Sequence, residues 1–353
     1  MSPKKQATFE DALQALLDNN TPFSPRYLEK FSDLSPEQIS ALKNIWPDVK
    51  PERRLSLLED LEELMDVETL VSFTGIARIA LEDLNPKVRT SAIRLLWEES
   101  DPRLISVFIR MMNKDPDAEV RATAAASLGY FVYLGMMEEL DDETTTRVVD
   151  ALVVKMNGDD QPLVRRRALE AMGYAVRPDV NALIRNAYMT RDREWMASAL
   201  FAMGRSGSEN WNAMVLAELM NPDVDVQLEA VRAAGELAIS DARRPLMNLL
   251  ENAEKLDDEV RLATLVSLGS IGGEGVRELL MEALDDAEED EEEAEIIESA
   301  LDELNFVEET GGNLMFDFAD QELQLDDEIL SPDDEDDSDD EDLGETPHKR
   351  KRH

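Results

Sequence analysis

The chain has 353 residues, no cysteine, two histidines and a formal net charge of −43 at pH 7. The lack of cysteine excludes disulfides, thiolate metal sites and a thiol nucleophile. Such an acidic chain is a poor direct ligand for nucleic acid, whose phosphates need a basic surface, and a basic protein is the better candidate partner.

Residues 1–48 are expected to form a helical cap at the N-terminal end. Thr8 is a candidate N-cap for an amphipathic helix that begins at Phe9. The run Ser35-Pro36-Glu37-Gln38 has the composition of a capping box, with proline at the first helical position. Because the outer face of a terminal repeat meets water, such repeats are usually atypical, and we interpret residues 1–48 in this way.

Residues 49–309 carry a recurring pattern whose clearest copy is DPDAEVRATAAASLG at 115–129. Asp115 is a candidate N-cap, Pro116 fits the first helical position, and Gly129 is a candidate C-cap. Each copy starts from an apolar anchor, with alanine usual four residues later and glycine usual nine residues later. The anchors lie 31 to 44 residues apart and are Val88, Val120, Val164, Trp195, Val226, Val260 and Ile296. This period predicts an array of about seven helical hairpins.

In each hairpin the anchor belongs to the second helix, and a first helix precedes it. We place the first helices at Arg103–Asn113, Thr146–Met156, Val180–Tyr188, Glu209–Met220, Arg243–Glu254 and Gly275–Asp285. The long interval between Val120 and Val164 leaves about a dozen extra residues near 130–146. These residues are interpreted either as a longer helix packed between repeats or as a protruding apolar contact.

The recurring motif D/N-P-x-x-x-V-R-x-x-A, followed by leucine and glycine, resembles the HEAT-like repeat over about residues 67–305. In particular, the motif resembles the short form found in phycobilisome-lyase-type proteins. The arginine position is held by Arg89, Arg121, Arg165 and Arg261, and it is lost at Met196, Gln227 and Ile297. The resemblance implies an all-α, right-handed α-solenoid, an armadillo-like superhelix, that serves as a protein-binding surface. It also implies that these arginines pair with turn acids of neighbouring repeats.

Positions two, three and six after each anchor are expected to point away from the core. In a HEAT-like solenoid the second helices would line the concave side, so these positions predict a partner-binding surface. They include Arg94, Arg166, Arg167, Glu170, Phe201, Leu228, Arg232, Leu262 and Val266. A mixed basic and apolar surface of this kind would suit an acidic, amphipathic peptide.

Residues 310–353 are expected to be a disordered acidic tail with a short basic terminus. From 285 to 345 the chain has 30 Asp or Glu and neither Lys nor Arg. Within the tail, Asn313–Leu330 alternates acids with apolar residues. It is either plain linker or a linear docking motif, for a partner or for the chain's own groove, with Leu314, Met315, Phe316 and Phe318 as its candidate residues.

Both histidines, His348 and His353, lie in the tail, so the repeat region has no histidine base or metal ligand. We therefore expect a non-enzymatic protein-interaction scaffold, without cofactor or metal. Two alternatives stay open, which are a chaperone or assembly factor that shields a basic client with the acidic tail, and a tetrapyrrole or bilin lyase-like protein. No apolar run approaches the roughly 20 residues of a membrane span, and we expect a cytoplasmic monomer.

Overall fold

The computed structural model of the chain describes residues 7–68, 70–251, 256–287 and 291–310. All regular elements in these ranges are helices, which confirms the predicted all-α class. The chain divides into two units, residues 1–305 and 306–353, and the first carries almost all of the described residues. Residues 311–353, with the predicted acidic tail and the motif of Leu314, Met315, Phe316 and Phe318, lie outside the described residues.

The N-terminal region consists of α1 (Phe9–Leu17), η1 (Pro25–Phe31), α2 (Pro36–Ile45) and η2 (Trp46–Asp48). Both predicted caps are confirmed. The Thr8 hydroxyl accepts the backbone N–H of Asp11 at 3.2 Å, and the Asp11 carboxylate accepts the Thr8 N–H at 3.1 Å. Ser35 and Gln38 form the equivalent reciprocal pair at the start of α2. These caps satisfy backbone donors that a helix start would otherwise leave unpaired.

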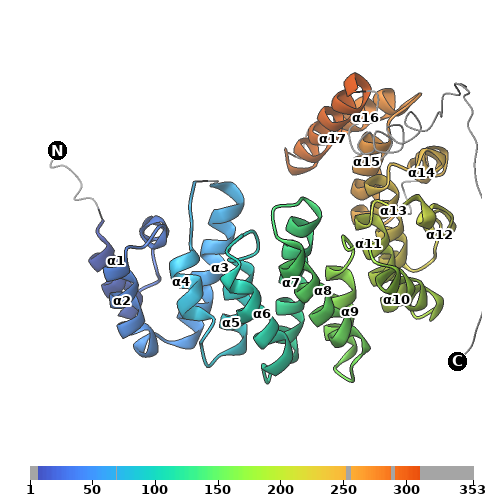
Figure 1. The fold of residues 1–353 in the computed structure, drawn as a ribbon. Coiled ribbons are helices and arrows are strands. Elements are labelled where there is room, and N and C mark those ends of the chain that lie inside the picture. The colour runs from blue at the N-terminus through green and yellow to red at the C-terminus, as the bar shows by residue number, and fades with distance from the viewer. Residues whose placement is uncertain (1–6, 69, 252–255, 288–290, 311–353) are drawn as a thin grey trace, which may run out of the picture. The chain divides into compact units, whose positions relative to one another are not determined.

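From residue 51 onward the chain forms two layers of helices (Figure 1). The first helices are α4 (Thr74–Ala80), α6 (Arg103–Lys114), α8 (Asp142–Asn157), α10 (Pro178–Met189), α12 (Asn212–Glu218) after η3 (Glu209–Trp211), α14 (Arg243–Leu250) after η4 (Ser240–Ala242), and α16 (Val276–Asp286). The second helices are α3 (Pro51–Val67), α5 (Pro86–Arg94), α7 (Ala118–Met136), α9 (Pro162–Ala171), α11 (Arg193–Arg205), α13 (Val224–Glu236), α15 (Asp258–Ile271) and α17 (Glu291–Thr310).

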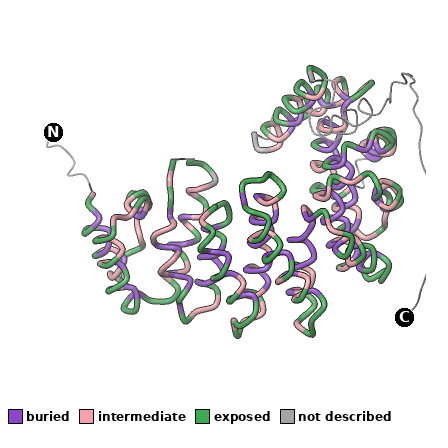
Figure 2. The backbone as a smooth tube through the Cα atoms, in the orientation of Figure 1, coloured by how far each residue is buried: buried purple, intermediate pink, exposed green. Residues whose placement is uncertain are grey.

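From α5 to α15 each second helix packs against its own first helix, and from α3 to α13 each also packs against the next second helix. Figure 2 shows that the buried residues lie where the helices of these layers face one another. The anchors Val88, Val120, Val164, Val226 and Val260 are all buried. The predicted hairpin array is therefore confirmed, and its apolar core is continuous from one hairpin to the next.

The predicted start of α7 was wrong by two residues. The N-cap of α7 is Asp117 rather than Asp115, and α13 likewise has Asp223 as its N-cap, two residues after Asn221. Asp115 instead accepts the backbone N–H of Asp117 at 3.0 Å, and Asn221 accepts that of Asp223 at 2.9 Å, so each closes a turn before the helix. In α5, by contrast, Asn85 directly before the proline is itself the N-cap.

The recurring glycines also have a different role from the predicted C-cap. Gly204, Gly235 and Gly269 lie inside α11, α13 and α15. A Cβ added to Gly235 would lie 2.8 Å from the Cα of Ser267, and one added to Gly204 would lie 3.0 Å from the Cα of Ala233. The missing side chain thus lets consecutive second helices approach closely, and the glycine row sets the spacing of the array.

The extra residues between Val120 and Val164 lengthen both helices of the hairpin. The helix α7 has 19 residues and α8 has 16. Phe131 is buried and packs near Phe108, with ring centroids 6.4 Å apart. Met136 and Met137 are exposed at the end of α7, so the segment is mostly packed helix with an exposed tip.

The arginines of the repeat motif hold successive turns together. The Nε and Nη2 atoms of Arg89 donate to the Asp115 carboxylate at 2.8 and 2.6 Å, and Arg121 donates to Asp160 at 2.7 Å. The predicted pairing with turn acids is confirmed for these two. Arg165 differs, because it donates to the Met156 carbonyl and lies 5.3 Å from the Trp195 ring.

Candidate functional site: the second-helix surface

We define the second-helix surface as the solvent-facing side of α5, α7, α9, α11, α13 and α15. Of the nine residues predicted to point outward here, seven have solvent contact. Arg94, Arg167, Arg232 and Val266 are exposed, and Arg166, Phe201 and Leu262 are half-buried. Glu170 and Leu228 are buried, at 7% exposure each, so the prediction that they face away from the core was wrong.

Contacts between neighbouring second helices explain both corrections. The Glu170 carboxylate accepts a hydrogen bond from the Ser198 hydroxyl of α11 at 2.6 Å and one from Arg167 at 2.6 Å. Its charge is therefore used between helices rather than offered to a partner. Leu228 lies on α13, which packs against α11 on one side and α15 on the other, and the side chain joins the core.

The expected basic character of this surface is also corrected, because its arginines are paired with glutamates. The closest contacts are Arg94 to Glu62 at 4.0 Å, Arg166 to Glu194 at 3.2 Å, Arg167 to Glu170 at 2.6 Å, and Arg232 to Glu229 at 3.0 Å and Glu259 at 2.8 Å. The surface is thus neutral to acidic. Because these arginines are paired, an acidic peptide would not be attracted to them as the sequence predicted.

These acidic partners have a simple sequence signal. Glu194 and Glu259 each stand one residue before an anchor, and each pairs with an arginine on the preceding second helix. Tabulating the position before each anchor would have found both. The positions after an anchor hold Arg166 and Arg232, and these two acidic partners stand before the next anchor.

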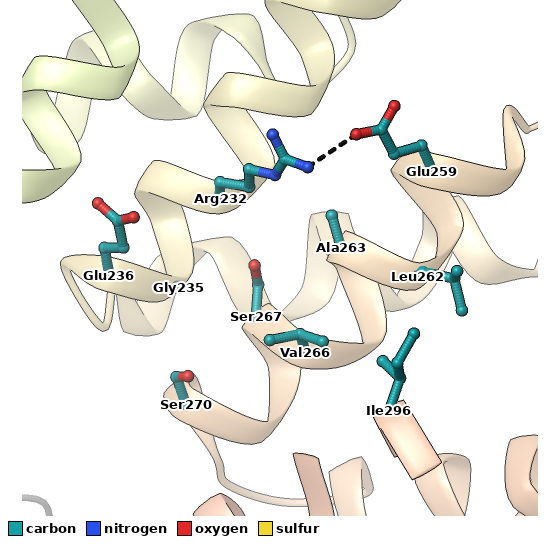
Figure 3. A pocket seen from close by; sticks show the side chains of 10 residues that line it. All are labelled: Arg232, Gly235, Glu236, Glu259, Leu262, Ala263, Val266, Ser267, Ser270 and Ile296. Carbon is teal, nitrogen blue, oxygen red and sulfur yellow. Dashed lines mark hydrogen bonds and ion pairs between the residues drawn. The ribbon is translucent and has the colours of Figure 1, made fainter. Parts of the chain in front are cut away.

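One hollow of about 400 Å³ lies where α13, α15 and α17 meet (Figure 3). Leu262, Val266 and Ile296 form its apolar wall, and the Arg232–Glu259 ion pair crosses its upper edge in the figure. Two predicted apolar residues, Leu262 and Val266, and the predicted Arg232 thus gather at one place. An apolar wall beside a charged pair can take an apolar side chain of a partner and orient its polar neighbours.

Glu236, at the rim of this hollow, has an unusual protonation state. Although the residue keeps solvent contact, its carboxyl group lies among protein atoms, and this desolvation raises its pKa to about 7. The charges of Arg205 and Arg232 oppose the rise, and that of Glu229 adds to it. Close to neutral pH the carboxyl group is therefore partly protonated.

A second hollow, of about 490 Å³, lies among α3, α5, α7 and α9. Its lining residues are Glu62, Met65, Arg94, Trp97, Glu98, Glu119, Ala122, Thr123, Ala126 and Arg167. Trp97 is 41% exposed, which is high for a tryptophan side chain. Two of the predicted residues, Arg94 and Arg167, belong to this hollow.

A row of half-buried aromatic side chains was missed by the sequence reasoning. Tyr130 and Tyr133 stack with ring centroids 6.3 Å apart, and Tyr133 packs against Tyr174 at 5.2 Å. The Arg205 guanidinium lies 5.3 Å from the Tyr174 ring centre and 4.1 Å from that of Phe201. The signal was position ten after each anchor, which holds Glu98, Tyr130, Tyr174, Arg205, Glu236, Ser270 and Phe306.

The described part of the chain holds neither a metal-binding cluster nor a membrane-spanning helix. There, no three His, Cys, Asp or Glu side chains gather as a metal ion would require. In the same residues, none of the helices is both long enough and apolar enough to cross a membrane.

Comparison with known proteins gives a repeat family and several distant structures. Residues 75–153 and 212–300 match the family model for HEAT repeats. No curated protein matches the chain. The X-ray structure of E. coli YibA is 17% identical, with 82% of this chain and 99% of that chain covered and a TM-score of 0.41.

Two further solved structures are similar at the same level. Human deoxyhypusine hydroxylase in complex with glycerol is 18% identical, covering 74% of this chain and 95% of that one at a TM-score of 0.33. A chain of the Kap95p complex with RanGDP is 15% identical, covering 88% of this chain and 44% of that one at a TM-score of 0.38. At these identities and scores, none of these likenesses assigns an activity or a partner.

Proposed function

We propose that the chain, whose residues 75–153 and 212–300 match HEAT repeats, is a non-catalytic adaptor that binds a protein partner on the second-helix surface. The observation that carries the proposal is the gathering of solvent-facing apolar, aromatic and arginine side chains around two hollows of this surface. We further propose that the protein is a monomer, lies in the cytoplasm and works without a cofactor.

The physical chemistry of the surface suits binding. Interfaces are enriched in aromatic residues and arginine, and a few such residues in hollows supply most of the binding free energy. Trp97, Phe201 and Arg232 are of these types and keep solvent contact. Because ion pairs such as Arg166–Glu194 already hold the side chains in place, little conformational entropy is lost on association.

Substituting one apolar residue in the hollow of Figure 3 tests the proposal. Val266→Asp places a charge against Leu262 and Ile296, and we expect the amount of partner captured by the full chain to fall at least about tenfold, because a buried unpaired charge costs several kcal/mol. The measurement is affinity capture at moderate salt with quantitative mass spectrometry.

The matched control is Met281→Asp on α16. Val266 is 43% exposed and Met281 is 55% exposed, so both changes add one charge at a comparably accessible apolar position. Met281→Asp should leave capture unchanged. Equal losses for both variants, or none for Val266→Asp, would contradict binding on the second-helix surface.

The acidic C-terminal segment supports one other function, that of a chaperone for a basic client. From 285 to 345 the chain has 30 acidic residues and no Lys or Arg, and such a segment can screen a positive surface. A chain ending at Thr310 keeps α1 to α17 and separates the two functions. The adaptor retains its partner, whereas the chaperone loses basic clients.

A further inference from the structure

Trp97, just after α5, and Tyr130 and Tyr133 of α7 form an aromatic row near two carboxylates, Glu98 and Glu139, that form no ion pair within the described residues. Trp97 and Ala126 line the same hollow, and Tyr130 and Tyr133 follow Ala126 by one and two turns on the same face of α7. The Tyr130 and Tyr133 rings lie 24° from parallel. Each is half-buried, and among the described residues neither phenol hydroxyl has a hydrogen-bond partner. One side of this row is therefore open to water.

Negative charge surrounds these rings. Burial raises the pKa of Tyr130, and the nearby carboxylates of Glu98 and Glu139 raise it further. Both glutamates are exposed, and no Lys or Arg of the described ranges forms an ion pair with either. In the adjoining hollow, Arg167 is already neutralised by Glu170. The charges that act on Tyr130 are therefore negative, which favours a cation beside this ring.

The same row already binds a cation within the chain. Arg205 lies over both Tyr174 and Phe201, at 5.3 and 4.1 Å from the ring centres. Tyr174 in turn packs on Tyr133. A guanidinium or ammonium group over an aromatic face is attracted by the ring quadrupole, more strongly where water is excluded. The rings of Tyr130 and Tyr133 offer the next positions along this row, and no arginine or lysine of the described residues lies over either of them.

We propose that Trp97, Tyr130, Tyr133, Glu98 and Glu139, the aromatic–carboxylate cluster, bind a lysine- or arginine-rich segment of a partner protein. Cationic side chains lie against the rings and pair with the two carboxylates. This inference rests on the adaptor function and deepens it by naming the chemistry of the partner. A basic segment suits the charge of the site, whereas an acidic segment would face repulsion.

The test uses the full chain and a fluorescein-labelled peptide of alternating lysine and alanine, with binding followed by fluorescence anisotropy at about 0.15 M salt, where distant charges are screened. We expect Glu98→Gln combined with Glu139→Gln to weaken binding at least about fivefold. Tyr130→Leu combined with Tyr133→Leu, which keeps apolar bulk and removes the rings, should have a similar effect.

The control removes two charges elsewhere, through Glu278→Gln and Glu282→Gln on the exposed side of α16. This control should leave the affinity within about twofold, since it changes net charge equally. Unchanged thermal unfolding midpoints show that each variant is folded. A glutamate–alanine peptide should bind at least about tenfold more weakly than the lysine–alanine peptide, as charge complementarity at the cluster requires.

Three results would overturn the cluster assignment. They are equal weakening by the control pair, insensitivity to both cluster variants, and equal affinity for the glutamate peptide. Failure of the cluster assignment can be distinguished from failure of the adaptor function. If Val266→Asp abolishes partner capture while the lysine peptide ignores the cluster variants, the adaptor function stands and the cluster assignment falls.

Discussion

Replacing Asp83 with alanine will lower the free energy of unfolding of the N-terminal part of the array by about 3–5 kcal/mol. The Asp83 side chain is fully buried, and it accepts hydrogen bonds from Trp46 Nε1 at 2.8 Å and from Arg54. It thus joins the cap to α3, the first second helix. Without the carboxylate, the Arg54 guanidinium, which is 10% exposed, stays buried and unpaired.

The matched control is Asp179→Ala. Asp179 accepts from Arg177 at 2.7 Å, but its side chain is 50% exposed, and exposed pairs contribute at most about 1 kcal/mol. Native-state hydrogen exchange measures both variants, because an array can open locally. We expect protection to fall in residues 9–48 for Asp83→Ala only. Equal loss of protection in both variants would show that burial of the pair is not decisive.

Replacing Gly235 with alanine will destabilise the array by about 1–3 kcal/mol, the usual cost of overpacking a close contact. The new Cβ would lie 2.8 Å from the backbone Cα of Ser267, and backbone cannot move aside as a flexible side chain can. Alanine otherwise favours a helix by about 1 kcal/mol over glycine, so the propensity gain opposes the clash. The sign of the change in unfolding free energy therefore tests whether the close approach of α13 and α15 outweighs the helix propensity of alanine.

Gly158→Ala is the control for this change. Gly158 has a φ of −75°, and its nearest contacts to an added Cβ are at 3.4 Å. There, alanine should be neutral or should stabilise the protein by up to about 1 kcal/mol, because it lowers the conformational entropy of the unfolded chain. Urea denaturation followed by circular dichroism measures both variants. A Gly235→Ala protein as stable as the parent would contradict the proposed role of the glycine row.

The sequence predicted the helices well because apolar spacing and turn residues are local signals. The first helix predicted at Arg103–Asn113 runs Arg103–Lys114, and that predicted at Arg243–Glu254 runs Arg243–Leu250. Capping boxes at Thr8 and Ser35 also depend on neighbours three residues away, so they too could be predicted.

Contacts between repeats were predicted less well. A glycine nine residues after an anchor, such as Gly235, has the same spacing whether it ends a helix or lets the next helix approach closely, so the spacing alone predicts a cap. Glu170 looks like a surface acid until Ser198 of α11 is placed beside it at 2.6 Å. The stack of Tyr130, Tyr133 and Tyr174 likewise joins two successive hairpins. Such features arise only once the units are packed together.

The central claim, that the second-helix surface binds a basic protein segment, is tested most directly by locating the contact. Zero-length carbodiimide cross-linking joins carboxylates of the full chain to lysines of the lysine–alanine peptide, and mass spectrometry then identifies the linked residues. The account predicts links concentrated at Glu98, Glu119 and Glu139, beside the exposed Trp97. Links confined to residues 311–353, or spread evenly over the first helices, would contradict it.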